Sequence, residues 1–149
     1  MTNLPRHLIQ FRALSYAEQY TLLVAAACIP LFWVGLRLLG LSRVQVWLLR
    51  SPVASRELMT LQDMQAIGKL VNIAASHTIG AGTCLTRSLL LWWLLLRRGI
   101  ESQVRIGVSL TEGVLTAHAW VEFEGVPVND QPDVSVQFLP FGDLPKSIQ

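Results

Sequence analysis

The fold class is decided by residues 84–123, whose sequence is CLTRSLLLWWLLLRRGIESQVRIGVSLTEGVLTAHAWVEF. The first part, up to Gly99, is apolar on nearly every side, which is typical of a helix at the centre of a fold. After Gly99 the period changes, because apolar and polar or small residues alternate over residues 104–110 and again over residues 115–123. Alternation with a period of two predicts strands. A helix followed by a small antiparallel sheet indicates an α+β fold.

Upstream of this segment the sequence predicts helices. Ser15 and Glu18 have the spacing of a capping box, and Gly40 offers a helix stop. Helices are therefore expected over residues 15–39, 41–50 and 55–76. We divide the chain into an apolar helical region, residues 1–55, and a core, residues 56–149.

The composition is apolar for a protein of 149 residues, with 52% hydrophobic and 15% charged residues. Residues 1–60 carry six arginines against two acids, a net charge of +4, and the remainder carries −2, which gives the overall +2. An apolar, basic region suits a membrane surface or an acidic partner. The arginines are scattered rather than clustered, so the sequence does not predict nucleic-acid binding.

The uncharged stretch Gln19–Leu36 approaches the length of a membrane span. Pro30 and Gly35 interrupt it, and the spacing of the arginines that follow favours a buried or interface-lying helix pair over a transmembrane helix. The stretch also starts too late, and lacks the small-residue cleavage site, of a secretory signal. We expect a cytoplasmic protein with peripheral membrane association.

The two cysteines, Cys28 and Cys84, give no disulfide pattern, which favours a reducing compartment. The histidines His7, His77 and His118 lie far apart in sequence, and no metal-binding spacing occurs. We therefore expect neither a metal ion nor a cofactor.

A candidate catalytic site combines Cys84, His118 and Asp130. Thr83 is a suitable N-cap, so Cys84 is expected in the first helical turn, where negative charge is stabilised. His118 lies on the second predicted strand, and Asp130 follows a short third strand over residues 126–129. A thiol at a helix start, with an imidazole and a carboxylate on neighbouring strands, is the layout that a cysteine nucleophile needs.

The register of the hairpin decides whether Asp130 can orient His118. A two-residue turn, Glu124-Gly125, would pair His118 with Gln131 and point Asp130 to the opposite face. A three-residue loop ending at Gly125 would pair His118 directly with Asp130, and this loop favours glycine in its last position. We expect the three-residue loop.

Each candidate has an alternative interpretation. A lone cysteine is more often a packing residue, as we expect for Cys28. A strand histidine can be a core residue, and Asp130 before Pro132 can be a turn residue. His77 is a rival base but is expected at a helix end, and Asp133 is a rival carboxylate that Pro132 disfavours. Arg87 either forms a salt bridge or supports the site electrostatically.

Five segments, in order, resemble the B-protein of lasso peptide biosynthesis, and together they cover roughly residues 60–140. They are Gly82-Thr83-Cys84-Leu85-Thr86-Arg87-Ser88-Leu89, Leu95-Leu96-Arg97-Arg98-Gly99-Ile100, Ile106-Gly107-Val108, Ala117-His118-Ala119-Trp120-Val121-Glu122 and Val128-Asn129-Asp130. The resemblance implies a transglutaminase-like, papain-related cysteine peptidase whose nucleophile helix packs on a small antiparallel sheet. It assigns Cys84 as nucleophile, His118 as base and acid, and Asp130 as the orienting carboxylate.

The family cuts the leader from a ribosomally made precursor, and an ATP-dependent cyclase then closes the ring. Fused members carry an amino-terminal leader-recognition domain, whereas residues 1–55 here predict apolar helices. The resemblance therefore implies the split form, which acts with a separate leader-recognition protein and the cyclase. A transglutaminase-like acyltransferase and a catalytically inactive, membrane-associated scaffold remain the alternatives.

Overall fold

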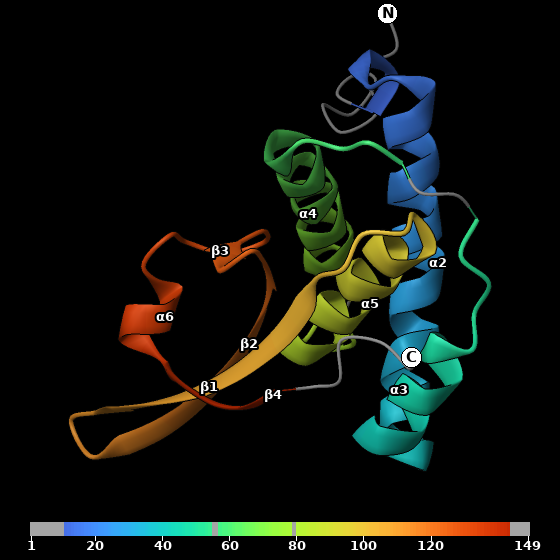
Figure 1. The fold of residues 1–149 in the computed structure, drawn as a ribbon. Coiled ribbons are helices and arrows are strands. Elements are labelled where there is room, and N and C mark those ends of the chain that lie inside the picture. Colours follow the sequence, from blue (N-terminus) through green and yellow to red (C-terminus); the bar gives the residue numbers. More distant parts are fainter. Residues whose placement is uncertain (1–10, 55–56, 79, 144–149) are drawn as a thin grey trace, which may run out of the picture.

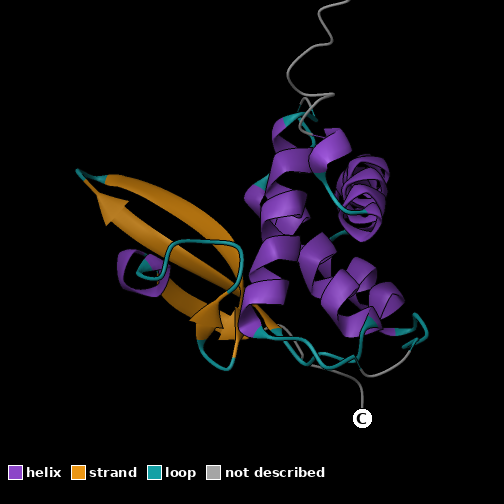
Figure 2. Ribbon diagram, turned by 90° about the horizontal axis from the view of Figure 1, so that it is seen from above, coloured by secondary structure: helices purple, strands orange, loops and turns teal. Residues whose placement is uncertain are grey.

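The computed structural model describes residues 11–54, 57–78 and 80–143. Helices and strands segregate into two parts that lie side by side (Figures 1 and 2). The helical part contains α2 (Tyr16–Leu39), α3 (Leu41–Leu49), α4 (Leu61–Ser76) and α5 (Cys84–Arg97). The sheet part contains β1 (Gln103–Thr111), β2 (Val114–Phe123), β3 (Val126–Pro127), α6 (Val134–Gln137) and β4 (Leu139–Asp143). This arrangement confirms the predicted α+β fold.

Helix α2 begins and ends where the sequence predicts. The Ser15 hydroxyl accepts a hydrogen bond from the backbone N–H of Glu18 at 3.3 Å, and the Glu18 carboxylate accepts from the Ser15 N–H at 2.8 Å. These bonds from the side chain and backbone of Ser15 lower the pKa of Glu18. Gly40, with φ +78°, ends the helix, and Pro30 lies within it.

Helix α4 begins at Leu61, and residues 57–60 are not helical, so the prediction is wrong over these residues, while Ser55 and Arg56 lie outside the described ones. Thr60 and Asp63 form a capping box that sets the boundary. Upstream of Thr60, the N–H groups of Ala54 and Glu57 donate to the last carbonyls of α5, at Arg97 and Arg98. Because these carbonyls have no partner inside α5, bonds to them are favoured at Ala54 and Glu57 over another turn of α4.

A single hydrophobic core joins the helices to the sheet. Helix α5 lies at its centre, and Trp92 and its leucines are almost all buried. The cluster includes residues from each of the other main elements: Ile29, Phe32, Leu48, Met64, Val71, Val104 and Val121. Helices α2 and α3 therefore share one core with α4, α5 and the sheet, across the boundary at residue 55 that the sequence suggests.

The sheet has the order β3-β2-β1-β4, and its paired strands are antiparallel. Val104 and Val121 pair with each other and face the helices, so His118, Trp120 and Glu122 lie on the other face of β2. Helix α6 and strand β4 were not predicted, and β3 is shorter than the predicted strand over residues 126–129.

Candidate active site

Cys84 is the first residue of α5, as predicted. The Thr83 hydroxyl caps the helix by accepting a hydrogen bond from the backbone N–H of Thr86 at 3.2 Å. Cys84 is half-buried and forms no disulfide. Its place in the first turn puts the thiol where the free N–H groups and the helix dipole favour negative charge.

Gly82 allows the loop before Cys84 to run against the end of α4. A Cβ atom at this position would lie 2.3 Å from the carbonyl oxygen of Ala75, a backbone atom that cannot move aside alone. The close approach therefore requires glycine, and it fixes the start of α5 relative to α4.

A buried polar network connects α5 to β2 and to the segment after β3. The Ser88 hydroxyl donates to the carbonyl oxygen of Ala119 at 2.9 Å and accepts from the Asn129 side chain at 3.3 Å. The Asn129 side-chain oxygen accepts from the N–H of Val121 at 2.8 Å, and the Asn72 side chain donates to the Asn129 carbonyl at 3.0 Å. Sequence reasoning missed this network, although Ser88 is a polar residue one turn after Cys84 in an apolar helix.

His118 and Asp130 are in direct contact, as predicted. The distance from His118 Nε2 to Asp130 Oδ2 is 2.6 Å, and less than a fifth of each side chain is exposed. The other carboxylate oxygen accepts from the N–H of Gln131 at 2.8 Å. An ionised carboxylate can only accept, so Nε2 is the protonated nitrogen and Nδ1 is left as the basic one.

The predicted reason for this contact is wrong, because the turn has two residues. Phe123 pairs with Val126, and Glu124 and Gly125 have φ values of +50° and +80°, as in a type I′ turn. The N–H of Val128 still donates to the carbonyl of Val121, but the N–H of Val121 then receives the side chain of Asn129. The backbone pairing between β2 and the chain after β3 stops at this point. The Asp130 side chain therefore reaches His118, although continued pairing in this register would place it on the opposite face of the sheet.

Aromatic side chains enclose the His118 ring. Trp120 stacks on it with ring centroids 6.1 Å apart, and Phe138 lies at 4.9 Å. Gly107, opposite His118 in β1, leaves room for this arrangement, since a Cβ there would lie 2.9 Å from the Cβ of Phe138. The unpredicted segment from α6 to β4 thus supplies one wall of the site.

Cys84 and His118 lie on α5 and β2, two elements that pack against each other. Both residues are described, and no hydrogen bond connects them in this structure. Cys84 lies one turn before Ser88, about 6 Å along the helix axis, while His118 precedes Ala119, whose carbonyl Ser88 contacts. The structure brings His118 to Asp130, whereas Cys84 lies at the start of α5, a helix that packs against β2.

A cysteine at a helix start, followed by a histidine on the sheet and its aspartate partner, agrees with the comparison of this chain with known families. The sequence model of the transglutaminase-like superfamily matches residues 26–141, more than half of the chain. The chain belongs to the transglutaminase-like superfamily. Comparisons with curated proteins and with solved structures gave no match.

His77 and Asp133, the rivals of His118 and Asp130 in this transglutaminase-like domain, form hydrogen bonds with residues of the neighbouring helices. His77 is the C-cap residue of α4, and its Nδ1 atom lies 2.8 Å from the carbonyl oxygen of Ile73. Asp133 precedes α6 and accepts from the side chain of Gln137 at 2.8 Å. Neither residue is in contact with Cys84 or His118 through a hydrogen bond within the described ranges.

Among the residues that the structure describes, Arg87 does not form the salt bridge that was the simpler of its two interpretations. Within the described residues it has no acidic partner, and its Nε atom is buried without a hydrogen bond. Its role near the site therefore stays a prediction. No group of three or more potential metal-ligating side chains occurs in the part of the chain that the structure describes.

Proposed function

We propose that this transglutaminase-like protein is a cysteine peptidase that removes the leader from a lasso peptide precursor. The observation that carries the proposal is the 2.6 Å hydrogen bond between His118 Nε2 and Asp130 Oδ2. It leaves Nδ1 free to take a proton from a thiol, and Cys84 at the start of α5 supplies the thiol.

In the proposed reaction, His118 takes the proton of the Cys84 thiol as the sulfur attacks the carbonyl carbon at the leader–core junction. The imidazolium then gives this proton to the departing amine as the C–N bond breaks, which leaves a thioester. Water, deprotonated by His118, attacks the thioester, releases the leader carboxylate and restores the thiol. The backbone N–H of Cys84 can stabilise the oxyanion, because the first N–H groups of a helix have no partner inside it.

The choice of a lasso precursor as substrate rests on the five sequence segments around Cys84, His118 and Asp130. By the same resemblance, a separate leader-recognition protein presents the precursor, and an ATP-dependent cyclase closes the ring after cleavage. In this proposal no nucleic acid and no metal ion takes part.

An acyltransferase is the second candidate, because the superfamily includes cysteine peptidases and acyltransferases. Both reactions pass through the same thioester, and they differ only in whether water or an amine attacks it. An inactive scaffold is the third interpretation, and it requires no reaction at Cys84.

The test is a mass-spectrometric cleavage assay with the precursor and its recognition protein. Wild type and Cys28→Ala should release the leader at similar rates, whereas Cys84→Ala should release none. Undiminished cleavage by Cys84→Ala would refute the peptidase. Adding a primary amine separates the first two candidates, since an acyltransferase yields the leader amide and a peptidase the free acid.

We further propose that α2 lies on a membrane surface in the cytoplasm. Among the described residues, α2 is long and apolar enough to span a bilayer, and only 17% of its most apolar window is buried. Its buried residues pack in the core, while Tyr16, Tyr20, Leu23 and Leu31 are more than half exposed. An apolar outer face next to Arg37 and Arg43 favours lying in the interface over crossing it.

A further inference from the structure

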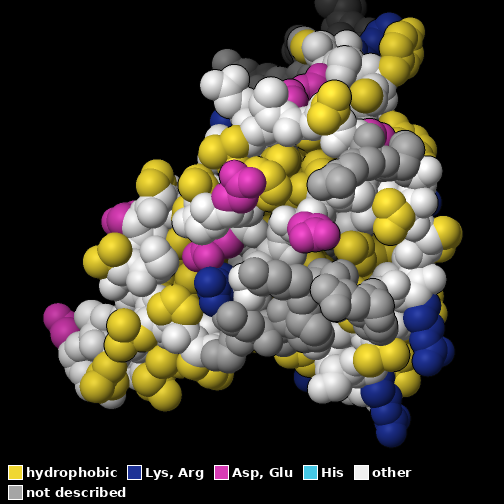
Figure 3. Space-filling view, viewed as in Figure 1, with side chains coloured by type: hydrophobic (Ala, Val, Ile, Leu, Met, Phe, Trp, Pro, Cys, Tyr) yellow, Lys and Arg dark blue, Asp and Glu magenta, His cyan; other side chains and the backbone are white. Residues whose placement is uncertain are grey.

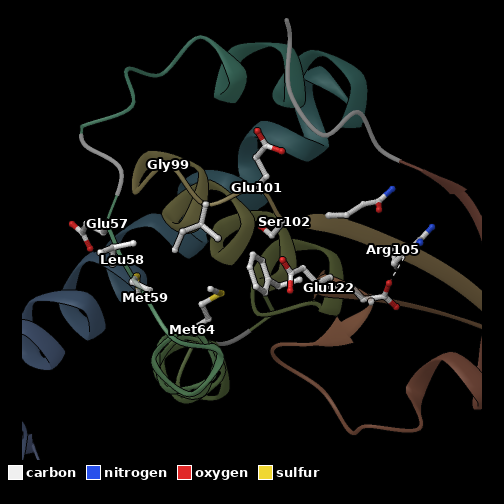
Figure 4. Close-up of a pocket in the computed structure, with 14 residues that line it drawn as sticks. Glu57, Leu58, Met59, Met64, Gly99, Glu101, Ser102, Arg105 and Glu122 are labelled. Atoms are coloured by element: carbon white, nitrogen blue, oxygen red, sulfur yellow. Dashed lines mark hydrogen bonds and ion pairs between the residues drawn. The ribbon is translucent and has the colours of Figure 1, made fainter.

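A pocket of about 620 Å³ opens at the end of the sheet where β2 turns into β3 (Figure 4). It lies between this turn, the segment before α4 and the connection from α5 to β1. Neither Cys84, His118 nor Asp130 lines it. Glu122, which does, is four residues from His118 along β2, or about 14 Å. The pocket is therefore distinct from the candidate active site, and Trp120, which stacks on His118 and donates to Glu122, lies between the two.

The pocket is acidic. Four carboxylates, Glu57, Glu101, Glu122 and Glu124, line it against one guanidinium, that of Arg105. Acidic side chains also gather in the middle of this face of the molecule (Figure 3). Glu57 forms an ion pair with Arg98 and Glu122 one with Arg105. Glu101 and Glu124 are exposed and have no ion-pair partner within the described residues.

Two buried polar atoms of the pocket lining have no hydrogen-bond partner among the described residues. They are Ser102 Oγ and Gln103 Nε2, and the two residues are only 3% and 8% exposed. A buried polar group without a partner is costly and rare, so each of these atoms calls for a partner that the described residues do not supply, such as a ligand or an ordered water. An amide nitrogen donates, so Gln103 requires an acceptor, whereas the Ser102 hydroxyl can donate or accept.

We propose that this pocket binds a basic side chain of a peptide, with its cationic group among the carboxylates and a peptide carbonyl accepting from Gln103. A lysine or arginine within a peptide supplies both groups, the cation on its side chain and the carbonyl on its backbone. A metal ion fits less well, because the described residues contain no cluster of three or more ligating side chains and because a metal cannot accept a hydrogen bond.

The probe is N-acetyl-arginine N-methylamide, titrated into the full-length protein by NMR, with the uncharged citrulline analogue for comparison. The arginine probe should bind at least about tenfold more tightly than the citrulline probe, and binding should weaken as salt is added. Equal affinity for the two probes, or no binding of either, would overturn the proposal.

Variants at the rim provide a matched comparison. Glu101→Gln and Glu124→Gln should each weaken binding of the arginine probe about threefold, as expected for partly exposed charge pairs. Glu112→Gln is the control, because Glu112-Gly113 forms the same kind of turn, with φ +51° and +80°, at the other end of β2. An effect of Glu112→Gln equal to that of Glu124→Gln would count against the pocket.

Gln103→Met tests the buried donor separately. The substitution keeps the shape of the side chain and removes the unpaired N–H group, so the melting temperature should stay the same or rise. Binding of the arginine probe should weaken by about two- to tenfold. A lower melting temperature with unchanged affinity would assign Gln103 a structural role instead. The readout is binding, so its outcome does not depend on whether the protein is a peptidase.

Discussion

The side chain of Asn129 donates a hydrogen bond to Ser88 Oγ across 3.3 Å, and this bond ties the segment that carries Asp130 to the helix that begins at Cys84. The same side chain accepts from the N–H of Val121, in place of the backbone pairing that ends there. Asn129 therefore determines where the third strand stops and where the next side chain points.

Replacing Asn129 should destabilise the protein more than replacing Asn72. Asn129→Ala leaves the N–H of Val121 without a partner in a buried place and removes the bond that the Ser88 hydroxyl accepts, so it should cost about 2–3 kcal/mol of stability. Asn72→Ala removes one bond to a backbone carbonyl, for about 1 kcal/mol. Urea denaturation measures both free energies of unfolding, and equal losses would contradict the assigned role of Asn129.

Asp130→Ala should lower the cleavage rate by about 100-fold without a comparable loss of stability. The imidazole then loses the acceptor that holds its Nε2 proton. Asp130→Asn should retain more activity than Asp130→Ala, because an amide oxygen can still accept from Nε2. The assay is the leader-release reaction, with thermal unfolding measured in parallel. Wild-type rates for Asp130→Ala would remove the carboxylate from the mechanism.

The two cysteines should differ in reactivity. Burial raises the pKa of Cys28, against a smaller lowering effect of the Arg97 charge, so little thiolate forms there at neutral pH. Cys84 lies at a helix start. Brief treatment of the native protein with iodoacetamide at pH 7 should alkylate Cys84 first, as peptide mass mapping would reveal. Faster labelling of Cys28 would argue against an activated thiol at the start of α5.

Gly82→Ala should impair cleavage strongly, because the added Cβ would meet the carbonyl oxygen of Ala75 at 2.3 Å and move the start of α5. Gly80→Asn is the matched control. Gly80 has φ +75° with nothing within 4 Å of an added Cβ, and asparagine tolerates this conformation better than most residues. The comparison needs leader-release rates and melting temperatures for both variants, and equal effects would show that the close approach is unimportant.

Leu31→Glu should weaken binding to lipid vesicles about tenfold or more, because it places a charge on the exposed apolar face of α2. Co-sedimentation with phosphatidylcholine vesicles, with and without phosphatidylglycerol, measures this, and the anionic lipid should increase binding. Val136→Glu, at an exposed apolar residue on α6, serves as the control. A wild-type protein that stays in the supernatant with both vesicle types would refute surface association.

Local signals in the sequence predicted most of the fold. The Ser15–Glu18 box, the Thr83 cap and the change of period after Gly99 each depend on a few neighbouring residues. Strand β4 was missed because residues 139–143 include a proline and a glycine and do not alternate clearly. Its pairing with β1 depends on distant residues, which a local pattern does not report.

The contact between His118 and Asp130 was predicted for a reason that the structure corrects. A glutamate at φ +50° is uncommon, so the sequence favoured a loop in which only Gly125 has a positive φ. The actual geometry depends on Asn129 and Ser88, which are 41 residues apart in the chain. Periodicity and turn preferences are short-range, and they contain no information about such a bond.

The shared core has a consequence for how this protein can be altered. Ile29, Phe32 and Leu48 pack in the same cluster as Leu91 and Val121, so a fragment that starts at residue 56 would expose the apolar surface of α5 to water. The first helices are therefore not an interchangeable module that can be removed or exchanged for a recognition domain. Any partner that binds their outer face binds the body that carries Cys84, His118 and Asp130.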